Sequence, residues 1–495
     1  MRRTRAGRHG CQNRRRVLSF ESELVIIGAG PAGVGAALAA TESGVETAIL
    51  DEAPTSGGQV YRALPPEFVP LPGVSLGPDH VMGAEQRRRL IASPALKAFG
   101  RRVWNVAPDL RVDALGPDGP EAWQARALVV ATGTTERVVP FAGWTLPGVI
   151  GLAAATVLLK SQQVMPGERT LVAGCGPLLA AVAVGILKAG GKVEAMIDLS
   201  GPADWLRALP SMTARPDLLW RGLGWARLVR AAGVPMLFRH GIRAVRDTGT
   251  DLEIEVVPVD ASCRPKFDTR PRRLRADAVT VGHGLVPATE ITRLLRAEHR
   301  FCGERGGWIA IRDADMRTTL DRVYVAGDGG GIAGAAAAFL QGQIAGLAAA
   351  HELGRLTSNA FRAAAAPLRK AQKRAERFGH AMAALMALRP GQLDDMRGDT
   401  IVCRCEDISR SEIEAAVAGG AREVNQLKAW TRCGMGPCQG RMCGEIAATL
   451  VAQRVGGREN AGIFTARAPI RPVPLSALAG EYDYADIHIP RAAPL

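Results

Sequence analysis

One short segment near the N-terminus constrains the fold of this chain more than any other. Residues 24–35 run from four apolar residues into three closely spaced glycines, Gly28, Gly30 and Gly33, and an alanine-rich stretch follows. Gly28 permits a tight turn, Gly30 lets the backbone approach a pyrophosphate, and Gly33 allows a helix to pack closely on the preceding strand. Because the first amides of such a helix point at an anion, the segment predicts a buried strand, a turn and a helix that hold a dinucleotide.

Two features that follow favour a dinucleotide over an ordinary strand-to-helix turn, which is the alternative for a lone glycine triplet. The next apolar run, residues 46–50, ends at Asp51 and Glu52, where a carboxylate can accept a hydrogen bond from a ribose hydroxyl. A glycine-rich loop comes next, in which Gly58 and Gln59 can pass close to the ligand. A plain surface loop is the other interpretation of these two residues.

Two later segments predict further contacts with the same ligand. An apolar strand at residues 127–131 ends in Thr132 and Gly133, and a strand that returns to the first sheet would place both beside the dinucleotide. A second strand then delivers Gly327 and Asp328 to the start of another glycine-rich helix. There Asp328 can accept a hydrogen bond from a sugar hydroxyl while the helix dipole faces a phosphate. The alternative role for Asp328 is a helix cap.

A second glycine turn lies in the middle of the chain. Gly174 and Gly176 follow an apolar strand, but Leu179 stands where a third glycine is expected and would move the helix away from the strand. A nucleotide site and a relic that no longer binds are equally open interpretations. Asp198, at the end of the next strand, favours an unphosphorylated ribose if a nucleotide binds. His283, after a later strand, is interpreted as structural, with a contact to flavin or substrate as the alternative.

Cysteines gather near the C-terminus. Cys403 and Cys405 form one pair and Cys433 and Cys438 another, with 27 residues between the pairs, so that four thiolates can converge on one metal centre. We interpret the centre as an iron–sulfur cluster, and thiols without a metal are a further alternative. Zinc is the main competitor, although a Cys-x-Cys pair is less usual in a zinc ribbon than Cys-x-x-Cys. Cys443 is left out of the predicted ligand set.

Charge and composition exclude several classes of protein. The 495 residues carry a net charge of +14, but the basic residues are mostly scattered and do not alternate with aromatic ones, which argues against nucleic acid as a partner. Residues 1–16 hold seven Arg and no acid, and the apolar run after them is too short for a signal peptide, so we expect a disordered leader at 1–22. No apolar run is long enough for a membrane span. Nine Cys without a signal peptide favour the cytoplasm, with a peripheral position at the inner membrane left open.

The order of these motifs resembles the two-dinucleotide-domain flavoproteins of the disulfide-reductase type. The resemblance covers about residues 23–350 and implies FAD held by the first glycine turn, by Asp51 or Glu52, and by Thr132, Gly133 and Asp328. The redox-active Cys-x-x-Cys of that family is missing ahead of the cysteine cluster, which argues against dithiol chemistry. The run that begins at Cys433 resembles the small [2Fe-2S] domain of the bacterioferritin-associated ferredoxin type.

The predicted fold class is therefore α/β, a two-dinucleotide-binding-domain flavoprotein with a small C-terminal α-rich [2Fe-2S] domain. The expected domains after the leader are the first part of the FAD-binding domain at 23–147, a degenerate NAD-like domain at 148–275, the second part of the FAD-binding domain at 276–352, a basic helical connector at 353–398, the [2Fe-2S] domain at 399–455 and a proline-rich tail at 456–495.

From about residue 22 to 485 the chain resembles the alpha-type subunits of bacterial dehydrogenases that oxidise amino acids or opines: the A subunit of opine oxidase, the alpha subunit of hydroxyproline or proline dehydrogenase, and one of the subunits of hydrogen cyanide synthase. Shared features are the runs at residues 57–62, 143–149 and 173–177 and the fused cysteine domain. The resemblance implies the electron-transfer subunit of a hetero-oligomer, which relays electrons between flavin and the [2Fe-2S] cluster toward a downstream electron acceptor. A flavin-dependent beta subunit would oxidise the amine, and FMN at a subunit interface is left open. The alternatives are a self-sufficient NAD(P)H-dependent reductase and, outside enzymes, a metal-sensing module.

Overall fold

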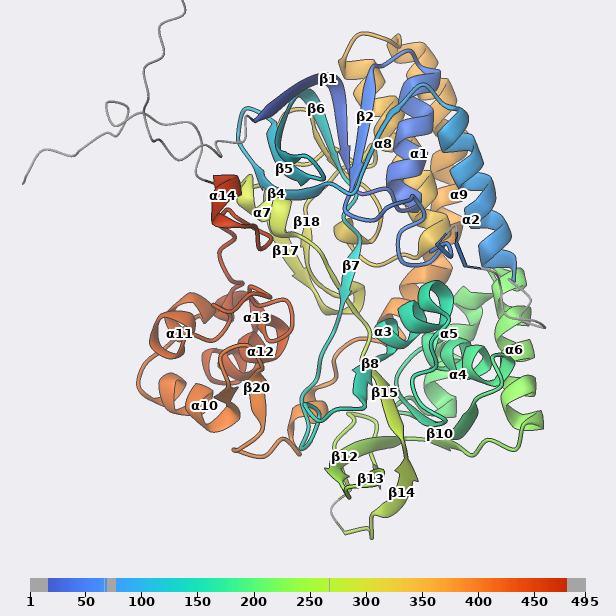
Figure 1. The fold of residues 1–495 in the computed structure, drawn as a ribbon, viewed down its shortest axis with the longest axis vertical. Coiled ribbons are helices and arrows are strands. Elements are labelled where there is room, and N and C mark those ends of the chain that lie inside the picture. Colours follow the sequence, from blue (N-terminus) through green and yellow to red (C-terminus); the bar gives the residue numbers. More distant parts are fainter. Residues whose placement is uncertain (1–16, 66, 69–76, 267, 479–495) are drawn as a thin grey trace, which may run out of the picture.

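The computed structural model describes residues 17–65, 67–68, 77–266 and 268–478, and it shows two α/β lobes with a small helical domain at their side (Figure 1). In Figure 1 the upper lobe combines N-terminal segments in blue with later ones in yellow and orange, whereas the lower lobe is green and comes from the middle of the chain. The chain therefore leaves the upper lobe, forms the lower one and returns. This arrangement confirms the predicted fold class.

The upper lobe is built on a seven-stranded sheet in the order β3-β2-β1-β6-β5-β4, with β19 also paired to β6. Two long helices pack on one face of the central strand, and the antiparallel strands and a short helix pack on the other, so Leu24, Val25 and Ile26 have no exposed surface. The elements of this lobe include β1 (Leu18–Ile27), α1 (Pro31–Glu42), β2 (Thr47–Asp51), α2 (Pro78–Ala92), β3 (Leu96–Phe99), β4 (Arg102–Val106), β5 (Arg111–Gly116), β6 (Gly119–Val130), α7 (Glu290–Leu294), β19 (Val323–Val325) and α8 (Ala335–Glu352).

Strand β1 begins earlier than the sequence analysis predicts. The expected leader at 1–22 differs from the structure in its last residues, because residues 18–22 belong to β1 and pair in parallel with residues 121–125 of β6. Phe20 also stacks on Trp123, with 4.3 Å between the ring centroids. Pairing with a strand far along the chain thus extends β1, and no local pattern reports such pairing. Residues 1–16 lie outside the described residues.

Helices α1 and α8 touch along their backbones. A Cβ at Gly342 would lie 1.9 Å from the carbonyl oxygen of Ala32, and a Cβ at Gly346 would lie 2.4 Å from that of Ala36. Side chains cannot be accommodated at such distances, so glycine is required at both positions of α8. The crossing of the two helices therefore depends on residues that have no side chain.

The lower lobe is built on a parallel five-stranded sheet in the order β11-β10-β9-β15-β8. The expected domain boundary at 275/276 would assign β15 to the upper lobe. In the structure β15 pairs with β8 and β9 and so belongs to the lower lobe. The chain returns to this sheet after an antiparallel excursion, and the sheet buries the apolar run of β15. The elements are β8 (Val149–Gly151), α3 (Leu152–Val157), β9 (Arg169–Gly174), α4 (Leu178–Lys188), β10 (Lys192–Asp198), α5 (Pro202–Met212), α6 (Pro216–Ala231), β11 (Met236–Phe238), β12 (His240–Asp247), β13 (Leu252–Pro258), β14 (Arg272–Ala276) and β15 (Ala278–Gly282).

Two short strands, β7 (Thr134–Glu136) and β16 (Leu285–Pro287), pair between the lobes. The carboxylate of Glu136 accepts a hydrogen bond from the backbone N–H of Ala153 at 3.0 Å, at the start of α3. Burial raises the pKa of Glu136 to about 7. The link between the lobes thus contains a carboxyl group that is half-protonated near neutral pH.

The region predicted to be a basic helical connector contains the long helix α9 (Ser358–Leu385), which packs against α8 and α5. A small domain with its own apolar core follows. Its elements are β20 (Ile401–Cys403), β21 (Ile408–Ser409), α10 (Arg410–Ala418), α11 (Val424–Thr431), α12 (Gly444–Val455) and α13 (Arg458–Ala461), with α14 (Leu475–Leu478) beyond it.

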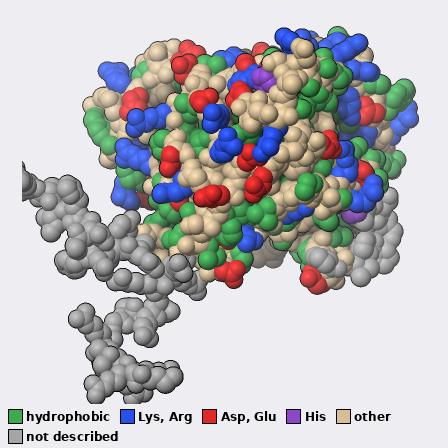
Figure 2. Space-filling view, turned by 90° about the horizontal axis from the view of Figure 1, so that it is seen from above, with side chains coloured by type: hydrophobic (Ala, Val, Ile, Leu, Met, Phe, Trp, Pro, Cys, Tyr) green, Lys and Arg blue, Asp and Glu red, His purple; other side chains and the backbone are tan. Residues whose placement is uncertain are grey.

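Among the described helices, none combines the length and the apolar character needed to cross a membrane. On the face shown in Figure 2, Lys and Arg side chains are interspersed with Asp and Glu. The charge distribution on this face thus matches the scatter of basic residues in the sequence.

Substitution Gly342→Ala should destabilise the protein by about 1–3 kcal/mol, because the new methyl group overlaps the backbone of α1. Thermal unfolding and the amount of bound flavin after purification measure the effect, and both should fall. The matched control is Gly222→Ala in α6, where nothing lies within 4 Å of the position that the new methyl group takes and alanine favours the helix by roughly 0.5–1 kcal/mol. Equal melting temperatures for the two variants would contradict the required close contact.

Candidate functional site

The predicted nucleotide cleft lies where β1 turns into α1. A Cβ at Gly33 would lie 1.7 Å from the carbonyl oxygen of Gly28, so glycine is needed for α1 to pack this close to the strand. Gly28 itself has a φ of +104°, and a Cβ there would lie 2.4 Å from the Ala131 carbonyl oxygen. Gly30 differs, because the nearest atom to its Cβ position is the Cα of Gly58 at 3.8 Å. The turn is therefore tight on its inner side and has room for a ligand at Gly30.

Asp51, and not Glu52, faces this turn. The Asp51 carboxylate accepts hydrogen bonds from the backbone N–H groups of Ala29 at 2.5 Å and Ala53 at 2.8 Å. Burial raises the pKa of Asp51, against the opposing effect of these two donors. Glu52 is exposed and pairs with Arg102 at 3.9 Å. Of the two carboxylates that the sequence leaves open, Asp51 is the one that lies beside the glycine turn.

The glycine-rich loop after β2 reaches the cleft through its backbone. A Cβ at Gly58 would lie 2.9 Å from the Cα of Gly30, so the loop packs directly on the first turn. Gln59 is exposed, and its side-chain oxygen accepts a hydrogen bond from Arg62 at 2.8 Å. The structure therefore brings Gly58 to the cleft and leaves Gln59 at the surface.

The second half of the upper lobe closes the cleft from the other side. A Cβ at Gly327 would lie 2.8 Å from the side chain of Ala32 in the first turn of α1. The neighbouring glycine, Gly329, places its Cβ position 3.5 Å from both the Thr132 hydroxyl and the Gly133 carbonyl oxygen. The structure thus brings together the glycine turns and the Ala-Thr-Gly strand end that the sequence predicts around one ligand.

Asp328 begins a short turn, η3 (Asp328–Gly330), in front of α8. Its Oδ1 accepts hydrogen bonds from the backbone N–H groups of Ala333 at 2.8 Å and Gly334 at 2.9 Å. Burial raises the pKa of Asp328, and these two donors oppose the shift. Asp328 therefore orders the approach to α8 with one oxygen, as in the capping alternative. Oδ2 forms no hydrogen bond within the described residues and is left for a hydroxyl group of a ligand. Glycine turns, backbone donors and this oxygen fit the diphosphate and sugar hydroxyls of FAD.

In the lower lobe, the segment after α9 covers the second glycine turn. A Cβ at Gly176 would lie 2.5 Å from Cγ of Met386, and a Cβ at Gly284 would lie 2.7 Å from the Met386 carbonyl oxygen. Arg137 donates a hydrogen bond to the same carbonyl at 2.7 Å. Leu179, which replaces the third glycine, is buried in the core of the lobe. The segment after α9 thus packs directly on the second glycine turn.

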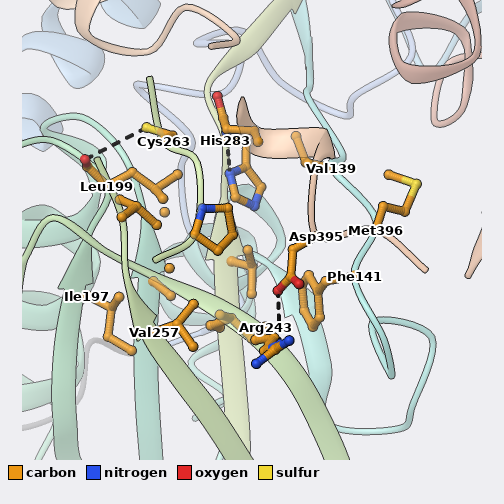
Figure 3. Close-up of a pocket in the computed structure, with 18 of the residues that line it drawn as sticks. Val139, Phe141, Ile197, Leu199, Arg243, Val257, Cys263, His283, Asp395 and Met396 are labelled. Carbon is orange, nitrogen blue, oxygen red and sulfur yellow. Dashed lines mark hydrogen bonds and ion pairs between the residues drawn. The ribbon is translucent and has the colours of Figure 1, made fainter. Parts of the chain in front are cut away.

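Little space is left at this edge of the lower sheet. A cavity of about 60 Å³ lies at the carboxyl ends of β9, β10 and β15. Asp395 and Arg243, which form an ion pair at 3.3 Å, are among the residues that line it (Figure 3). Small-molecule sites usually measure about 300–1,000 Å³. Asp198, the residue expected at a ribose, accepts hydrogen bonds from the Ser200 N–H at 2.8 Å and the Trp205 indole at 3.2 Å. These contacts favour a relic over a working nucleotide site.

His283 lines this small cavity. Its Nδ1 lies 3.3 Å from the side-chain amide of Gln392, and burial lowers its pKa to about 4, so the ring is neutral. The nearby Cys175 is also buried, which raises the pKa of its thiol to about 12. Both groups are packed between the lower lobe and the segment after α9, which agrees with the structural interpretation of His283.

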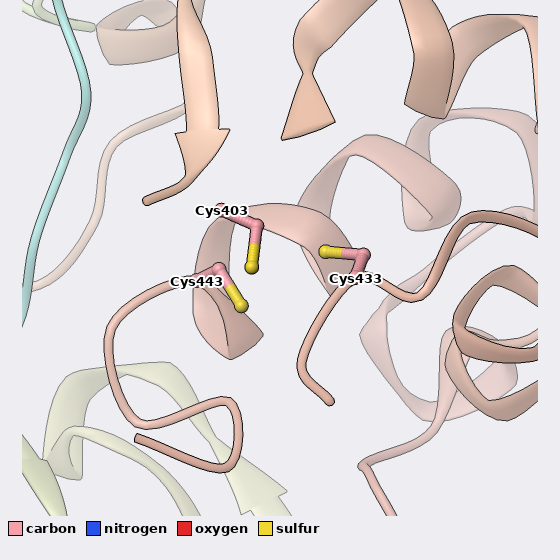
Figure 4. A group of neighbouring side chains, drawn as sticks. All are labelled: Cys403, Cys433 and Cys443. Carbon is pink, nitrogen blue, oxygen red and sulfur yellow. The ribbon is translucent and has the colours of Figure 1, made fainter. Parts of the chain in front are cut away.

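Three cysteines converge in the C-terminal domain. The sulfur atoms of Cys403, Cys433 and Cys443 all lie within 4.8 Å of one another, and all three side chains are buried (Figure 4). Cys403 ends β20, Cys433 follows α11 and Cys443 directly precedes α12. Hydrogen bonds from the other two thiols lower the pKa of Cys403. A buried group of thiols with one favoured as thiolate fits a soft metal centre.

The other two cysteines form a pair beside this group. The thiol of Cys405 interacts with the thiol and backbone of Cys438, and a Cβ at Gly436 would lie 3.3 Å from the Cys405 sulfur. The structure thus divides the four predicted ligands between two groups and adds Cys443, which the prediction omits. The signal that could have found it is the even spacing of Cys433, Cys438 and Cys443, five residues apart.

Comparisons with known proteins agree with this geometry. The family model for pyridine nucleotide-disulphide oxidoreductases matches residues 22–342, and that for the sarcosine oxidase A3 domain matches residues 397–481. The A subunit of opine oxidase from Rhizobium meliloti (strain 1021) is 33% identical over 92% of this chain and 98% of its own length. The HcnB subunit of hydrogen cyanide synthase from Pseudomonas aeruginosa is 32% identical over 92% of this chain and 97% of its own length.

A solved structure shares the fold. L-proline dehydrogenase from P. horikoshii covers 94% of this chain, which in turn covers 80% of that chain, with a TM-score of 0.67 and 19% sequence identity. The matches imply FAD, whereas none of them supports FMN. The chain therefore belongs to the pyridine nucleotide-disulphide oxidoreductase family, and it is a flavin-dependent oxidoreductase similar along most of its length to the A subunit of opine oxidase.

Proposed function

We propose that the chain is the electron-transfer subunit of a multi-subunit dehydrogenase in which a flavin-bearing beta subunit oxidises an amino acid, an opine or hydroxyproline. Bound FAD would take up electrons in pairs, and a [2Fe-2S] centre would pass them singly to a downstream acceptor. The relatives' names, which designate subunits of opine oxidase and hydrogen cyanide synthase, support a hetero-oligomer. The observation that carries the proposal is the buried group of thiols on a domain packed against the FAD-binding lobe.

Specific contacts hold the cysteine domain against the upper lobe and against the segment that runs from the upper lobe to the lower one. Arg441 pairs with Glu290 of α7 at 2.7 Å. The indole N–H of Trp144 donates a hydrogen bond to the carbonyl of Ile401 at 2.7 Å, two residues before Cys403. Because both contacts involve residues close in sequence to the cysteines, they fix the position of the thiol group relative to the lobe. A fixed position is what electron transfer between two centres requires.

The hydrogen bonds of the two acids in the cleft support the proposal that a different chain of the complex oxidises the amine. Asp51 and Asp328 both accept backbone hydrogen bonds from the turns they order. A general base for amine oxidation must be free to approach the substrate proton. Both oxygens of Asp51 accept backbone hydrogen bonds, and Asp328 keeps only Oδ2 for a hydroxyl group of the cofactor, so the chain's contribution is to bind and orient the cofactor.

The alternative of a self-sufficient NAD(P)H-dependent reductase requires an open site in the lower lobe. Met386 lies against both Gly176 and Gly284, and the cavity left beside them measures about 60 Å³. Arg137, which is buried, fixes the Met386 carbonyl. A pyridine nucleotide would have to displace this segment, so the packing supports the relay over the reductase.

Production of the chain with and without its beta partner tests the proposed division of labour. The complex should reduce an artificial dye with proline, hydroxyproline or an opine as the donor. The chain alone should retain FAD and be at least about a hundredfold slower, because the substrate site lies on the partner. The beta partner by itself, assayed with the same dye, serves as the control. Full activity of the isolated chain would contradict the proposal.

Anaerobic stopped-flow mixing of the FAD-loaded chain with NADH or NADPH tests the alternative reductase. The flavin absorbance should stay unchanged over the time of the experiment, because the chain's own segment fills the lower site. Dithionite, which needs no site, is the control and should bleach the same sample. Rapid bleaching by either nucleotide would favour the reductase.

The metal centre is tested with Cys403→Ser, since Cys403 belongs both to the predicted ligand set and to the three converging thiols. The anaerobically purified native chain should contain about two iron and two acid-labile sulfide per chain, as a [2Fe-2S] cluster requires, and the variant should lose most of both. The control is Cys302→Ser, which changes a cysteine of the upper lobe and should keep the iron. Zinc in place of iron in the native chain would contradict the assignment.

The same measurement separates the two possible ligand sets. The sequence predicts that Cys438→Ser removes iron and Cys443→Ser does not. The opposite pattern would assign the centre to the group in Figure 4, with Cys443 as a ligand.

A further inference from the structure

A second hollow lies on the upper lobe, behind the glycine turn η3. Its volume is about 390 Å³, and it is bounded by β17 (His299–Cys302), β18 (Gly307–Ala310), the segment 311–316 and α9. This volume falls in the range of small-molecule sites, which is about 300–1,000 Å³. Basic side chains outnumber acidic ones on its walls, with Arg300, Arg305, Arg312, Arg369 and Lys373 against Asp313 and Glu376.

Both acids already serve other partners. Glu376 accepts hydrogen bonds from the side-chain amides of Gln341 at 2.7 Å and Gln372 at 2.9 Å. Asp313 accepts one from the backbone N–H of Arg317 at 2.9 Å and so orders its own segment. The positive charge of the hollow is therefore only partly balanced by its own walls.

Most of the cations form no ion pair, although the charges of Glu376 and Asp328 act on Arg305 and Arg312 from a greater distance. Arg369 pairs with Asp315, outside the hollow. Within the described ranges, no ion pair is formed by Arg300, Arg305, Arg312 or Lys373. Four like charges that share one concave surface repel one another, and a bound anion would reduce that repulsion in addition to the carboxylates of Glu376 and Asp328.

Two of these arginines are packed deepest. A Cβ at Gly330 would lie 2.6 Å from Cζ of Arg312, and a Cβ at Gly331 would lie 2.8 Å from Nε of Arg305, so both guanidinium groups rest on the glycine turn. Arg312 donates one hydrogen bond, to the Val325 carbonyl at 2.6 Å. The Nε of Arg305 is buried and has no hydrogen-bond partner in the described structure. A buried donor without a partner is costly, and a bound acceptor would remove that cost.

Electrostatics point the same way. Burial is the main cause that lowers the pKa of Arg312 to about 10; the charge of Arg305 adds to the shift, and the charges of Glu376 and Asp328 oppose it. Burial likewise lowers the pKa of Arg305. Both groups keep their charge at neutral pH, and a negative charge placed between them would stabilise both.

We propose that this hollow binds the phosphate group of a small organic phosphate, with Arg305 and Arg312 as inner ligands and Arg300 and Lys373 at the mouth. Guanidinium groups offer paired donors that match phosphate oxygens. The volume exceeds what a phosphate group fills, which leaves space for an organic part. This site goes beyond the electron relay, which does not use it.

The site shares a wall with the flavin cleft. Gly330 borders the hollow. A Cβ at the preceding residue, Gly329, would lie 3.5 Å from the hydroxyl oxygen of Thr132 in the flavin cleft. Turn η3 thus separates the two sites. Experiments on this hollow must keep the cleft filled, so that a phosphate probe cannot enter the flavin site instead.

Isothermal titration of the FAD-loaded chain with AMP and with inorganic pyrophosphate tests the proposal. Both should bind with one ligand per chain. The variant Arg305→Met should weaken both at least about tenfold, because it removes an inner donor and keeps the apolar stem. The control is Arg377→Ala, which changes an exposed arginine of α9 outside the hollow. This variant should bind as the native chain does.

A second variant covers the case in which Arg305→Met fails to fold. Arg300→Ala combined with Lys373→Ala changes exposed side chains at the mouth and should also weaken AMP at least about tenfold, with the flavin content unchanged. No one-to-one binding of either probe by the native chain, or an equal loss in Arg377→Ala, would overturn the site. If pyrophosphate binds and AMP does not, the proposal that the ligand has an organic part is wrong.

Discussion

The backbone contact between α1 and α8 holds the flavin cleft together. At Gly342 and Gly346 the absence of a side chain lets α8 lie directly on the carbonyl groups of α1. Helix α1 starts at the first glycine turn, and α8 follows the turn that contains Asp328. The contact therefore brings together two cofactor-binding motifs that the inserted lower lobe separates along the chain. The position of Gly327 and Asp328 opposite the first glycine turn depends on this alignment, whereas Asp51 is placed by the pairing of β2 with β1.

The segment after α9 contacts both the lower lobe and the cysteine domain. Met386 packs against the glycine turn of the lower lobe, whereas Leu393 and Met396 belong to the apolar core of the cysteine domain. One short stretch thus packs on the second glycine turn and also contributes to the core of the domain with the converging thiols. The lower lobe thereby supports the segment that leads into the cysteine domain.

Local patterns explain what could be predicted. Gly28 and Gly33 have steric roles within a single strand–turn–helix unit, and the structure shows the close contacts that these roles require. The parallel strands of both sheets follow in the same way from apolar runs between helices, whereas β4 and β5 join the upper sheet by antiparallel pairing. Other features depend on distant partners and left no local pattern. Residues 18–22 join β1 because β6 pairs with them, and β15 joins the lower sheet because β9 and β8 receive it.

By itself the sequence determined the glycine turns, the class of fold and the concentration of thiols near the C-terminus, because each of these is written in residues close together along the chain. Only the tertiary structure decided between Asp51 and Glu52, brought Cys443 next to Cys403 and Cys433, and placed Met386 in the second glycine turn. The physical reason is that these features depend on how elements far apart in sequence pack against one another. Packing decides which side chain at a strand end faces the turn, which loops converge and which segment covers a glycine turn.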